Sequence, residues 1–277
     1  AMDLIKDNIE PIKIGLIDNG FDTKHEDLGF AENGVFYLNG ANSNEDRDID
    51  TNVKTEDILS HGTHVAGIMA ASGDNDDGIC GIYPYANGRL YGVSSAGMQL
   101  YKENFIYRNS IMTQKIAYSE LILRNVKVIN QSQGFNWQSG WEDYWKEQLN
   151  TDESWEQHYS KIPDEIGTFF DEADLLGDFL NRLLEKDYDF VITASAGNYS
   201  SAQTGTLESR WNSWNTMIDK DKYPNVYNRI IVVGAVNAKN NITSFSCGGE
   251  RVDIFAPGDN IYSTMPNNKY DRLKGTS

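Results

Sequence analysis

His61-Gly62-Thr63-His64-Val65-Ala66-Gly67 is the stretch of sequence that decides the fold. It joins two histidines to a run of small and apolar residues that continues to Ala71, and this pattern predicts a helix over 61–72. Glycine and alanine allow such a helix to pack closely against neighbouring backbone. An imidazole at its start would therefore be held rigidly, although an isolated histidine is more often structural than catalytic.

On either side of this stretch, apolar runs alternate with helical periodicity. The runs that predict strands lie at 12–17, 89–93, 126–131, 188–194, 229–235 and 252–256. The segments with helical periodicity lie at 61–72, 110–124 and 164–186. Alternation of this kind is typical of an α/β domain with a mainly parallel sheet. A chain of 277 residues, 39% of them hydrophobic, has the size of one large domain.

Three further polar residues stand at the ends of short motifs. Asp18 ends the apolar run Ile14-Gly-Leu-Ile, Asn198 ends Thr193-Ala-Ser-Ala-Gly, and Ser277 ends Lys274-Gly-Thr. Each motif alone has an ordinary explanation, because Asp and Asn are common turn formers and Gly-Thr-Ser occurs often by chance. Together with His61 they place an acid, a base and a hydroxyl nucleophile in the order Asp, His, Ser.

These blocks resemble the subtilisin family of serine endopeptidases, the subtilases, over about residues 12–277. The order Asp, His, Ser is that of subtilisin. His25-Glu26-Asp27-Leu28 is also similar to the His-Pro-Asp-Leu that follows the aspartate in this family, with Glu26 in place of the proline. The resemblance implies a three-layer α/β fold with a mainly parallel central sheet flanked by helices.

The resemblance also implies a role for each polar residue. Asp18 would orient the general base His61, Ser277 would be the nucleophile, and Asn198 would donate to the oxyanion. His64 would be structural. The implied activity is hydrolysis of peptide bonds through an acyl-enzyme. The alternative is a catalytically inactive subtilase-like domain that binds peptides or a partner protein, and retention of all four positions favours the enzyme.

Ser132-Gln133-Gly134 follows the strand predicted at 126–131. By resemblance it forms one wall of the primary specificity pocket, where an extended substrate pairs by strand addition. Gln133 stands where a leucine is common in the family. This change would make the floor of the pocket more polar, and it leaves the usual preference for large apolar side chains open.

Residues 135–163 have no counterpart of this length in the family pattern. The tryptophans among their acidic and polar residues are Trp137, Trp141, Trp145 and Trp155. In the family geometry this Trp-rich acidic insertion would lie near the substrate cleft. It is either a lid or specificity wall that contacts peptide, or a surface elaboration whose tryptophans pack against their own helix.

An acidic loop, Asp74-Asn75-Asp76-Asp77-Gly78-Ile79, occupies the position that binds a stabilising calcium ion in many subtilases. Asp74, Asn75 and Asp76 offer the hard oxygen ligands that calcium prefers. The alternative is a solvated acidic turn. Catalysis by the predicted triad requires no cofactor, so calcium would have a structural role.

The composition restricts the partners. A formal net charge of −17 argues against binding to nucleic acid or to an anionic membrane, whereas polypeptide substrates are compatible with it. The only two cysteines, Cys80 and Cys247, lie in different blocks, so neither a disulfide framework nor a zinc site is indicated. No apolar run approaches the roughly 18 residues of a membrane span.

Family members continue past the nucleophile with a helix that begins there. The single domain over 1–277 is therefore expected to be incomplete at its C-terminus, with the missing segment in the same polypeptide or supplied separately. A chain that ended at Ser277 is expected to be weakly active or inactive, because its carboxylate would lie where negative charge develops. Any propeptide would lie upstream. The resemblance favours a secreted or cell-surface bacterial protein, and the composition is equally compatible with the cytoplasm.

Overall fold

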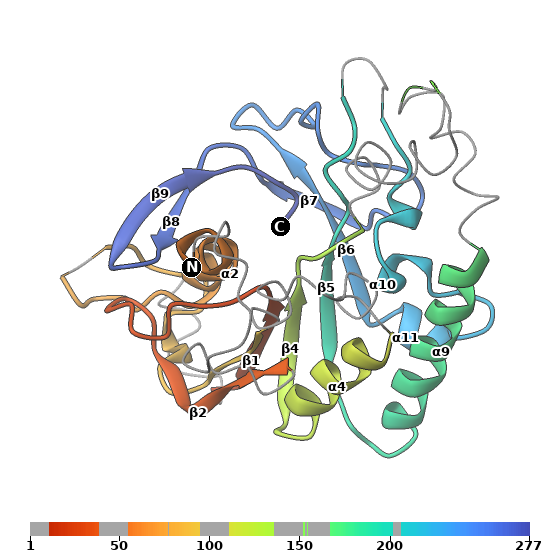
Figure 1. Cartoon of the computed structure of the whole chain (residues 1–277), viewed down its shortest axis with the longest axis horizontal. Helices are drawn as coiled ribbons and strands as arrows, with labels where there is room; N and C mark the ends of the chain where they lie inside the picture. The colour runs from red at the N-terminus through yellow and green to blue at the C-terminus, as the bar shows by residue number, and fades with distance from the viewer. Residues whose placement is uncertain are drawn as a thin grey trace. The chain divides into compact units, whose positions relative to one another are not determined.

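The computed structural model describes residues 11–38, 55–76, 78–94, 111–135, 152, 154, 167–201 and 206–277. Seven strands form one sheet in the order β2-β3-β1-β4-β5-β6-β7, and β8 and β9 form a second sheet (Figure 1). The pairs β1·β3, β2·β3, β5·β6 and β6·β7 are all parallel. These findings confirm the predicted α/β fold, with helices flanking a mainly parallel sheet.

The chain divides into two compact units. The first unit comprises residues 1–130 and 262–272, and the second comprises residues 131–261 and 273–277. Strands of the first unit are β1 (Lys13–Asp18), β2 (Phe30–Tyr37) and β3 (Leu90–Ser94). Its helices are α2 (Thr55–Ala70), the short 3-10 helix η2 (Pro84–Ala86) and α4 (Ile111–Ile122). Strand β4 (Val126–Gln131) ends at the boundary between the units.

The core of the first unit forms where α2 meets the sheet. Leu16 of β1, Ala66 of α2 and Leu90 of β3 have no exposed surface. They belong to one apolar cluster with Ile14, Phe21, Leu28, Val65, Ala70 and Ala86. The small residues after His64 are therefore the buried face of α2, as their pattern predicts.

Helix α2 also packs against the hairpin of β8 (Ile261–Met265) and β9 (Lys269–Leu273) (Figure 1). A methyl group added at Gly67 would lie only 2.2 Å from the hydroxyl oxygen of Thr264. The Ser263 and Thr264 hydroxyls donate to the backbone carbonyls of His64 and Thr63, at 2.8 and 2.7 Å. Gly67 thus permits the close approach that these two hydrogen bonds require.

The second unit contains β5 (Val191–Ser195), β6 (Ile230–Val236) and β7 (Ile254–Pro257). Helix α9 (Gly167–Leu184) packs beside α10 (Trp214–Met217) and α11 (Pro224–Tyr227), and a 3-10 helix, η4 (Ser209–Trp211), precedes α10 (Figure 1). The apolar stripe predicted on α9 is confirmed at Ala173, Leu176 and Leu180, which are all buried.

The tryptophans of the predicted insertion lie outside the described residues. Its first residue, Phe135, is described and packs its ring edge-on against Phe169 and Trp214, with ring centroids 4.7 and 4.9 Å apart. The start of the insertion is therefore anchored on α9 and α10. Its location near a substrate cleft stays a prediction.

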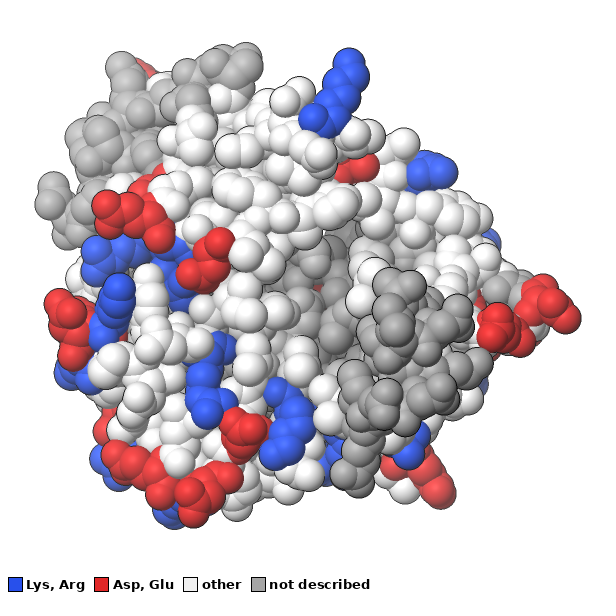
Figure 2. All heavy atoms as spheres, turned by 180° about the vertical axis from the view of Figure 1, so that it is seen from behind, with Lys and Arg blue, Asp and Glu red and all other residues white. Residues whose placement is uncertain are grey.

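Charged side chains of both signs lie close together along the left and lower parts of the face drawn in Figure 2. Ion pairs on the second unit include Arg182–Asp178 at 2.9 Å and Lys222–Asp174 at 2.5 Å. Both cysteines are free thiols. Among the helices that the structure describes, none is long and apolar enough to cross a membrane.

Candidate active site

Asp18 and His61 form a hydrogen-bonded pair in the first unit. Asp18 is the last residue of β1, and its side chain is completely buried. The Nδ1 atom of His61 lies 2.9 Å from both carboxylate oxygens of Asp18. Because a carboxylate can only accept, Nδ1 carries the proton and donates it to Asp18. The Nε2 atom of His61 is then the unprotonated nitrogen in the neutral ring, which is the tautomer that a general base needs.

The two residues after His61 bring helix α2 against the loop that follows Asp18. A methyl group added at Gly62 would lie 2.2 Å from the carbonyl oxygen of Gly20, so only glycine allows this approach. The Thr63 hydroxyl accepts a hydrogen bond from the backbone N–H of Asp22 at 2.9 Å and donates to the Leu59 carbonyl at 2.6 Å. His61 lies inside α2, six residues after the helix begins at Thr55. The sequence pattern predicts a helix that begins at His61.

Two opposing effects act on the pKa of His61. Burial of the ring is the largest influence and lowers the pKa, because it disfavours the charged imidazolium. The charge of Asp18 and its hydrogen bond to Nδ1 favour the imidazolium, and together they raise the pKa above its ordinary value of 6.5. The histidine side chain remains 36% exposed, so Nε2 can exchange protons with a second group.

Two further histidines have described side chains, and both are buried. The backbone carbonyl of His64 accepts from the Ser263 hydroxyl at 2.8 Å, and the structural role of its ring stays a prediction. His25 is buried as well, and its Nε2 lies 3.1 Å from the carbonyl oxygen of Lys269. The ring of His61, in contrast, contacts the buried carboxylate of Asp18.

Ser277 lies in the second unit next to Ser132. The Ser132 hydroxyl donates to the Ser277 carbonyl at 3.1 Å, and the Ser277 hydroxyl lies 3.4 Å from the Ser132 carbonyl. Ser277 is exposed. A methyl group added at Gly258 would lie 2.4 Å from the carbonyl oxygen of Gly275, so glycine is needed where the loop after β7 supports this segment.

Asn198 is oriented by Thr276, the residue before Ser277. The Thr276 backbone N–H and hydroxyl both donate to Asn198 Oδ1, at 2.9 and 3.1 Å. The same hydroxyl accepts from the Gly197 N–H at 3.1 Å. Since both donors on Thr276 hold the amide oxygen, the two N–H groups on Nδ2 are directed away from Thr276. Asn198 is exposed, so these groups can reach a ligand.

The predicted substrate wall begins where β4 ends. Ser132 is buried, Gln133 is half-buried and Gly134 is exposed, and none of the three belongs to a regular strand. The Phe135 N–H donates to the Asn212 carbonyl at 2.7 Å, which joins this wall to the segment before α10. The effect of Gln133 on pocket polarity stays a prediction.

Comparison with known proteins shows the family of this chain. The model of the subtilase family matches residues 10–277. The chain belongs to the subtilase family. It is 28% identical to the "Major intracellular serine protease" of Bacillus subtilis over 96% of its own length and 64% of that protein. It is 29% identical to Subtilisin DY of Bacillus licheniformis, over 96% of this chain and 71% of that protein.

This subtilase is also similar to a further curated relative and to a solved structure. Subtilisin E of Bacillus subtilis is 30% identical over 96% of this chain, which spans 51% of that protein. Among solved structures, "Structure of Prenylagaramide maturation protease PagA" matches 96% of this chain and 70% of that chain, with a TM-score of 0.53 and 16% identity. At this low identity the structural match supports the fold alone.

The acidic loop of this subtilase is fastened to a carboxylate that the calcium prediction did not include. Asp27 is fully buried, and its Oδ1 accepts from the Asn75 side-chain amide at 2.9 Å. Its Oδ2 accepts from the Ile79 N–H at 3.0 Å and from the Tyr270 hydroxyl at 3.3 Å. Asp27 precedes Leu28 in the quoted His25–Leu28 motif, which was its only sequence signal.

The conformation of the acidic loop is described at the three residues predicted to bind calcium. Asn75 turns its amide nitrogen rather than its oxygen to Asp27, and Asp74 and Asp76 adopt left-handed φ values of 58° and 59°. Among the described residues, no three acidic, histidine or cysteine side chains gather as a metal site would require. Hydrogen bonds from Asn75 and Ile79 fasten the described part of the loop to Asp27. Calcium binding at Asp74, Asn75 and Asp76 stays a prediction.

Proposed function

We propose that this protein is a serine endopeptidase that uses Asp18, His61 and Ser277 as a catalytic triad. The observation that carries the proposal is the contact of His61 Nδ1 with both oxygens of the buried Asp18 carboxylate. This contact selects the tautomer with a basic Nε2 and favours the imidazolium that forms when Nε2 accepts a proton. Membership of the subtilase family supports polypeptides as the substrate class.

In the proposed reaction, Ser277 Oγ forms a bond to the carbonyl carbon of the substrate while its proton moves to His61 Nε2. The proton then passes to the amine nitrogen as the C–N bond breaks, and this leaves an ester on Ser277. Water attacks the ester by the same route in reverse, with His61 again the base. No metal or organic cofactor takes part in these steps.

Negative charge develops on the carbonyl oxygen during both attacks, and in this proposal the Asn198 side chain stabilises it. Its Nδ2 donors are oriented by the two hydrogen bonds from Thr276 to Oδ1. A donor fixed in advance needs no reorganisation when the charge appears, which is why such groups contribute strongly to catalysis.

The test of the proposed function is covalent labelling of the full-length protein with a fluorophosphonate, read by intact mass. We expect one stoichiometric adduct on Ser277 in the wild-type protein and none in His61→Ala, because the serine needs its base to react. An unlabelled wild-type protein that still binds peptides would contradict the proposal and would favour the inactive, peptide-binding alternative.

Replacement of Asn198 by alanine is expected to lower kcat about 10²- to 10³-fold with little change in KM. This is the magnitude found for loss of the corresponding donor in subtilisin, a member of the same family. The effect falls on kcat because the oxyanion exists only in the transition state and intermediate. The control is Asn181→Ala on α9, where the half-buried side-chain amide donates to Glu185 Oε1 at 2.8 Å. A rise in KM alone would show that Asn198 binds the substrate in its ground state.

Removal of calcium is expected to lower Tm by several degrees, because an ion bound at the acidic loop stabilises the folded state by mass action. The measurement is thermal unfolding in excess calcium and in excess chelator. Asp74→Asn removes one predicted ligand and should weaken this response. An unchanged Tm on chelation of the wild-type protein would contradict the calcium site predicted at Asp74, Asn75 and Asp76.

A further inference from the structure

We propose that Asn212 limits the substrate pocket of this protein to small side chains, so that glycine, alanine and serine are preferred at the residue whose carbonyl is attacked. That residue is called the acyl residue below. The proposal rests on the proposed function, because it assumes that Ser277 and Asn198 bracket the scissile carbonyl. It assigns a role to a residue that no motif in the sequence identifies.

The position of the acyl residue follows from contacts within the second unit. Its carbonyl carbon must approach Ser277 Oγ, which lies 3.4 Å from the Ser132 carbonyl oxygen. Its carbonyl oxygen must approach Asn198, which Thr276 ties to the nucleophile segment. In the proposal the acyl side chain enters between the segments 132–135 and 195–198, because the first contacts Ser277 through Ser132 and the second carries Asn198.

The carboxamide of Asn212 already lies between these two segments. A methyl group added at Gly134 would lie 2.1 Å from Asn212 Oδ1, and one added at Gly197 would lie 2.9 Å from the same atom. Asn212 is 1% exposed, so it is enclosed on all sides. Its side chain therefore lies against the backbone of both segments, at Gly134 and at Gly197, and fills the volume between them.

Hydrogen bonds hold the carboxamide in this place and use its polar groups. Nδ2 donates to the Ser195 carbonyl at 2.6 Å and lies 3.3 Å from the Ser195 hydroxyl, while Oδ1 accepts from the Tyr199 hydroxyl. The backbone carbonyl of Asn212 accepts from Phe135. With both N–H groups directed at Ser195, the amide offers no donor to a polar acyl side chain, and its main effect on the substrate is steric.

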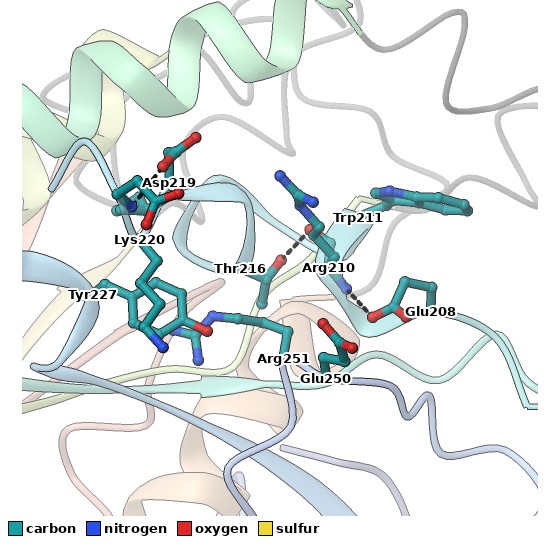
Figure 3. A pocket seen from close by; sticks show the side chains of 11 residues that line it. Glu208, Arg210, Trp211, Thr216, Asp219, Lys220, Tyr227, Glu250 and Arg251 are labelled. Atoms are coloured by element: carbon teal, nitrogen blue, oxygen red, sulfur yellow. Dashed lines mark hydrogen bonds between the residues drawn. The ribbon is translucent and has the colours of Figure 1, made fainter. Parts of the chain in front are cut away.

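Hydrogen bonds at neighbouring residues of the same segment, 208–216, are drawn in Figure 3. Glu208 Oε1 accepts from the Arg210 N–H at 3.2 Å, and the Thr216 hydroxyl donates to the Arg210 carbonyl at 3.0 Å (Figure 3). These residues line a separate pocket of about 500 Å³, and the guanidinium of buried Arg251 lies 4.2 Å from the ring centroid of Tyr227 there. A substrate side chain therefore cannot displace Asn212 without breaking a hydrogen-bonded turn.

The test is a series of peptide substrates that differ only at the acyl residue. We expect kcat/KM for alanine to exceed that for phenylalanine at least tenfold in the wild-type protein. Asn212→Ala opens the space and is expected to shift this ratio at least tenfold toward phenylalanine, because small changes in pocket volume alter discrimination by about 10- to 200-fold. Asn212→Ser, which keeps a hydroxyl as partner for Tyr199, should shift the ratio in the same direction.

The matched control is Asn215→Ala. Asn215 is a buried asparagine three residues further on whose amide donates to Gln131 Oε1 at 2.7 Å, so its loss loosens the same wall without opening the space at Gly134. The preference for alanine should survive this change. Equal cleavage of alanine and phenylalanine substrates by the wild-type protein, or an equal shift in both asparagine variants, would overturn the proposal.

A binding measurement separates this inference from the proposed function. Ser277→Ala should bind product peptides that end in alanine at least tenfold tighter than those that end in phenylalanine, and adding Asn212→Ala should abolish the difference. Failure of fluorophosphonate labelling together with selective binding would refute the protease but leave the pocket intact. Labelling together with unselective binding would refute the role of Asn212 alone.

Discussion

Replacement of Ser277 by alanine is expected to lower kcat about 10⁶-fold, which is the magnitude known for the nucleophile of subtilisin itself. The loss follows from the chemistry, because no other group can form the acyl-enzyme once Oγ is removed. The remaining hydrolysis should exceed the uncatalysed rate by about 10³- to 10⁴-fold, since substrate binding and the oxyanion donor persist. The measurement is kcat under substrate saturation, with the variant purified separately from active enzyme.

A serine outside the site provides the control for this loss. Ser119 lies on α4, where its hydroxyl donates to the carbonyl of Lys115 at 2.8 Å. Ser119→Ala removes the same oxygen atom from a helix in the first unit and should leave kcat within a factor of two. A Ser277→Ala protein that retained more than one hundredth of the wild-type kcat would mean that another residue is the nucleophile.

Replacement of Asp18 by asparagine is expected to lower kcat about 10⁴-fold while the fold is retained. Asparagine occupies the same volume, but its amide can donate to His61 Nδ1 and so stabilise the tautomer whose Nε2 carries the proton. The variant also loses the negative charge that raises the pKa of His61. The acid limb of kcat/KM should therefore move to lower pH.

The direction of this shift follows from the protonation state that catalysis requires. His61 must be neutral to accept a proton, so wild-type activity should fall as the pH drops through a value above the ordinary 6.5. Without the charge of Asp18, burial of the ring dominates and lowers the pKa, so the variant should lose activity only at lower pH. The control is Asp178→Asn on α9, which removes an exposed ion pair with Arg182. An unchanged acid limb in Asp18→Asn would show that another group controls it.

Much of the fold could be predicted because the buried strands of a parallel sheet are continuous apolar runs. The run at 126–131 coincides with β4, and the run at 229–235 is displaced by one residue from β6. Strand β2 was missed because Glu32, Asn33 and Gly34 interrupt its apolar pattern. The structure shows a register shift at this place, with Asn33 at a φ of 51°.

The hairpin of β8 and β9 was missed for a different reason. Its strands are mostly polar, so the apolar pattern is weak, although Asn267 and Asn268 carried a turn signal. Both asparagines adopt left-handed φ values, 65° and 55°, as the tight turn of a hairpin requires. A search for consecutive asparagines between short polar strands would have found it.

Some residues of the candidate site could be predicted from neighbouring residues in the sequence, and others could not. Asp18, His61, Asn198 and Ser277 stand in local motifs, and the structure supplies their contacts within each unit. Asp27 and Asn212 could not be predicted because their partners are far apart along the chain. Asp27 binds Asn75 and Tyr270, while Asn212 touches Gly134 and Ser195. Such roles arise only when folding brings distant backbone segments together.

Thr276 links Ser277, the proposed nucleophile, to Asn198, the proposed oxyanion donor. Its N–H and hydroxyl hold Asn198, its hydroxyl also accepts from Gly197, and it is covalently joined to Ser277. A displacement of the segment at Thr276 would therefore disturb Ser277 and Asn198 together. In the proposed enzyme, attack by the serine and stabilisation of the oxyanion would then be lost at the same time.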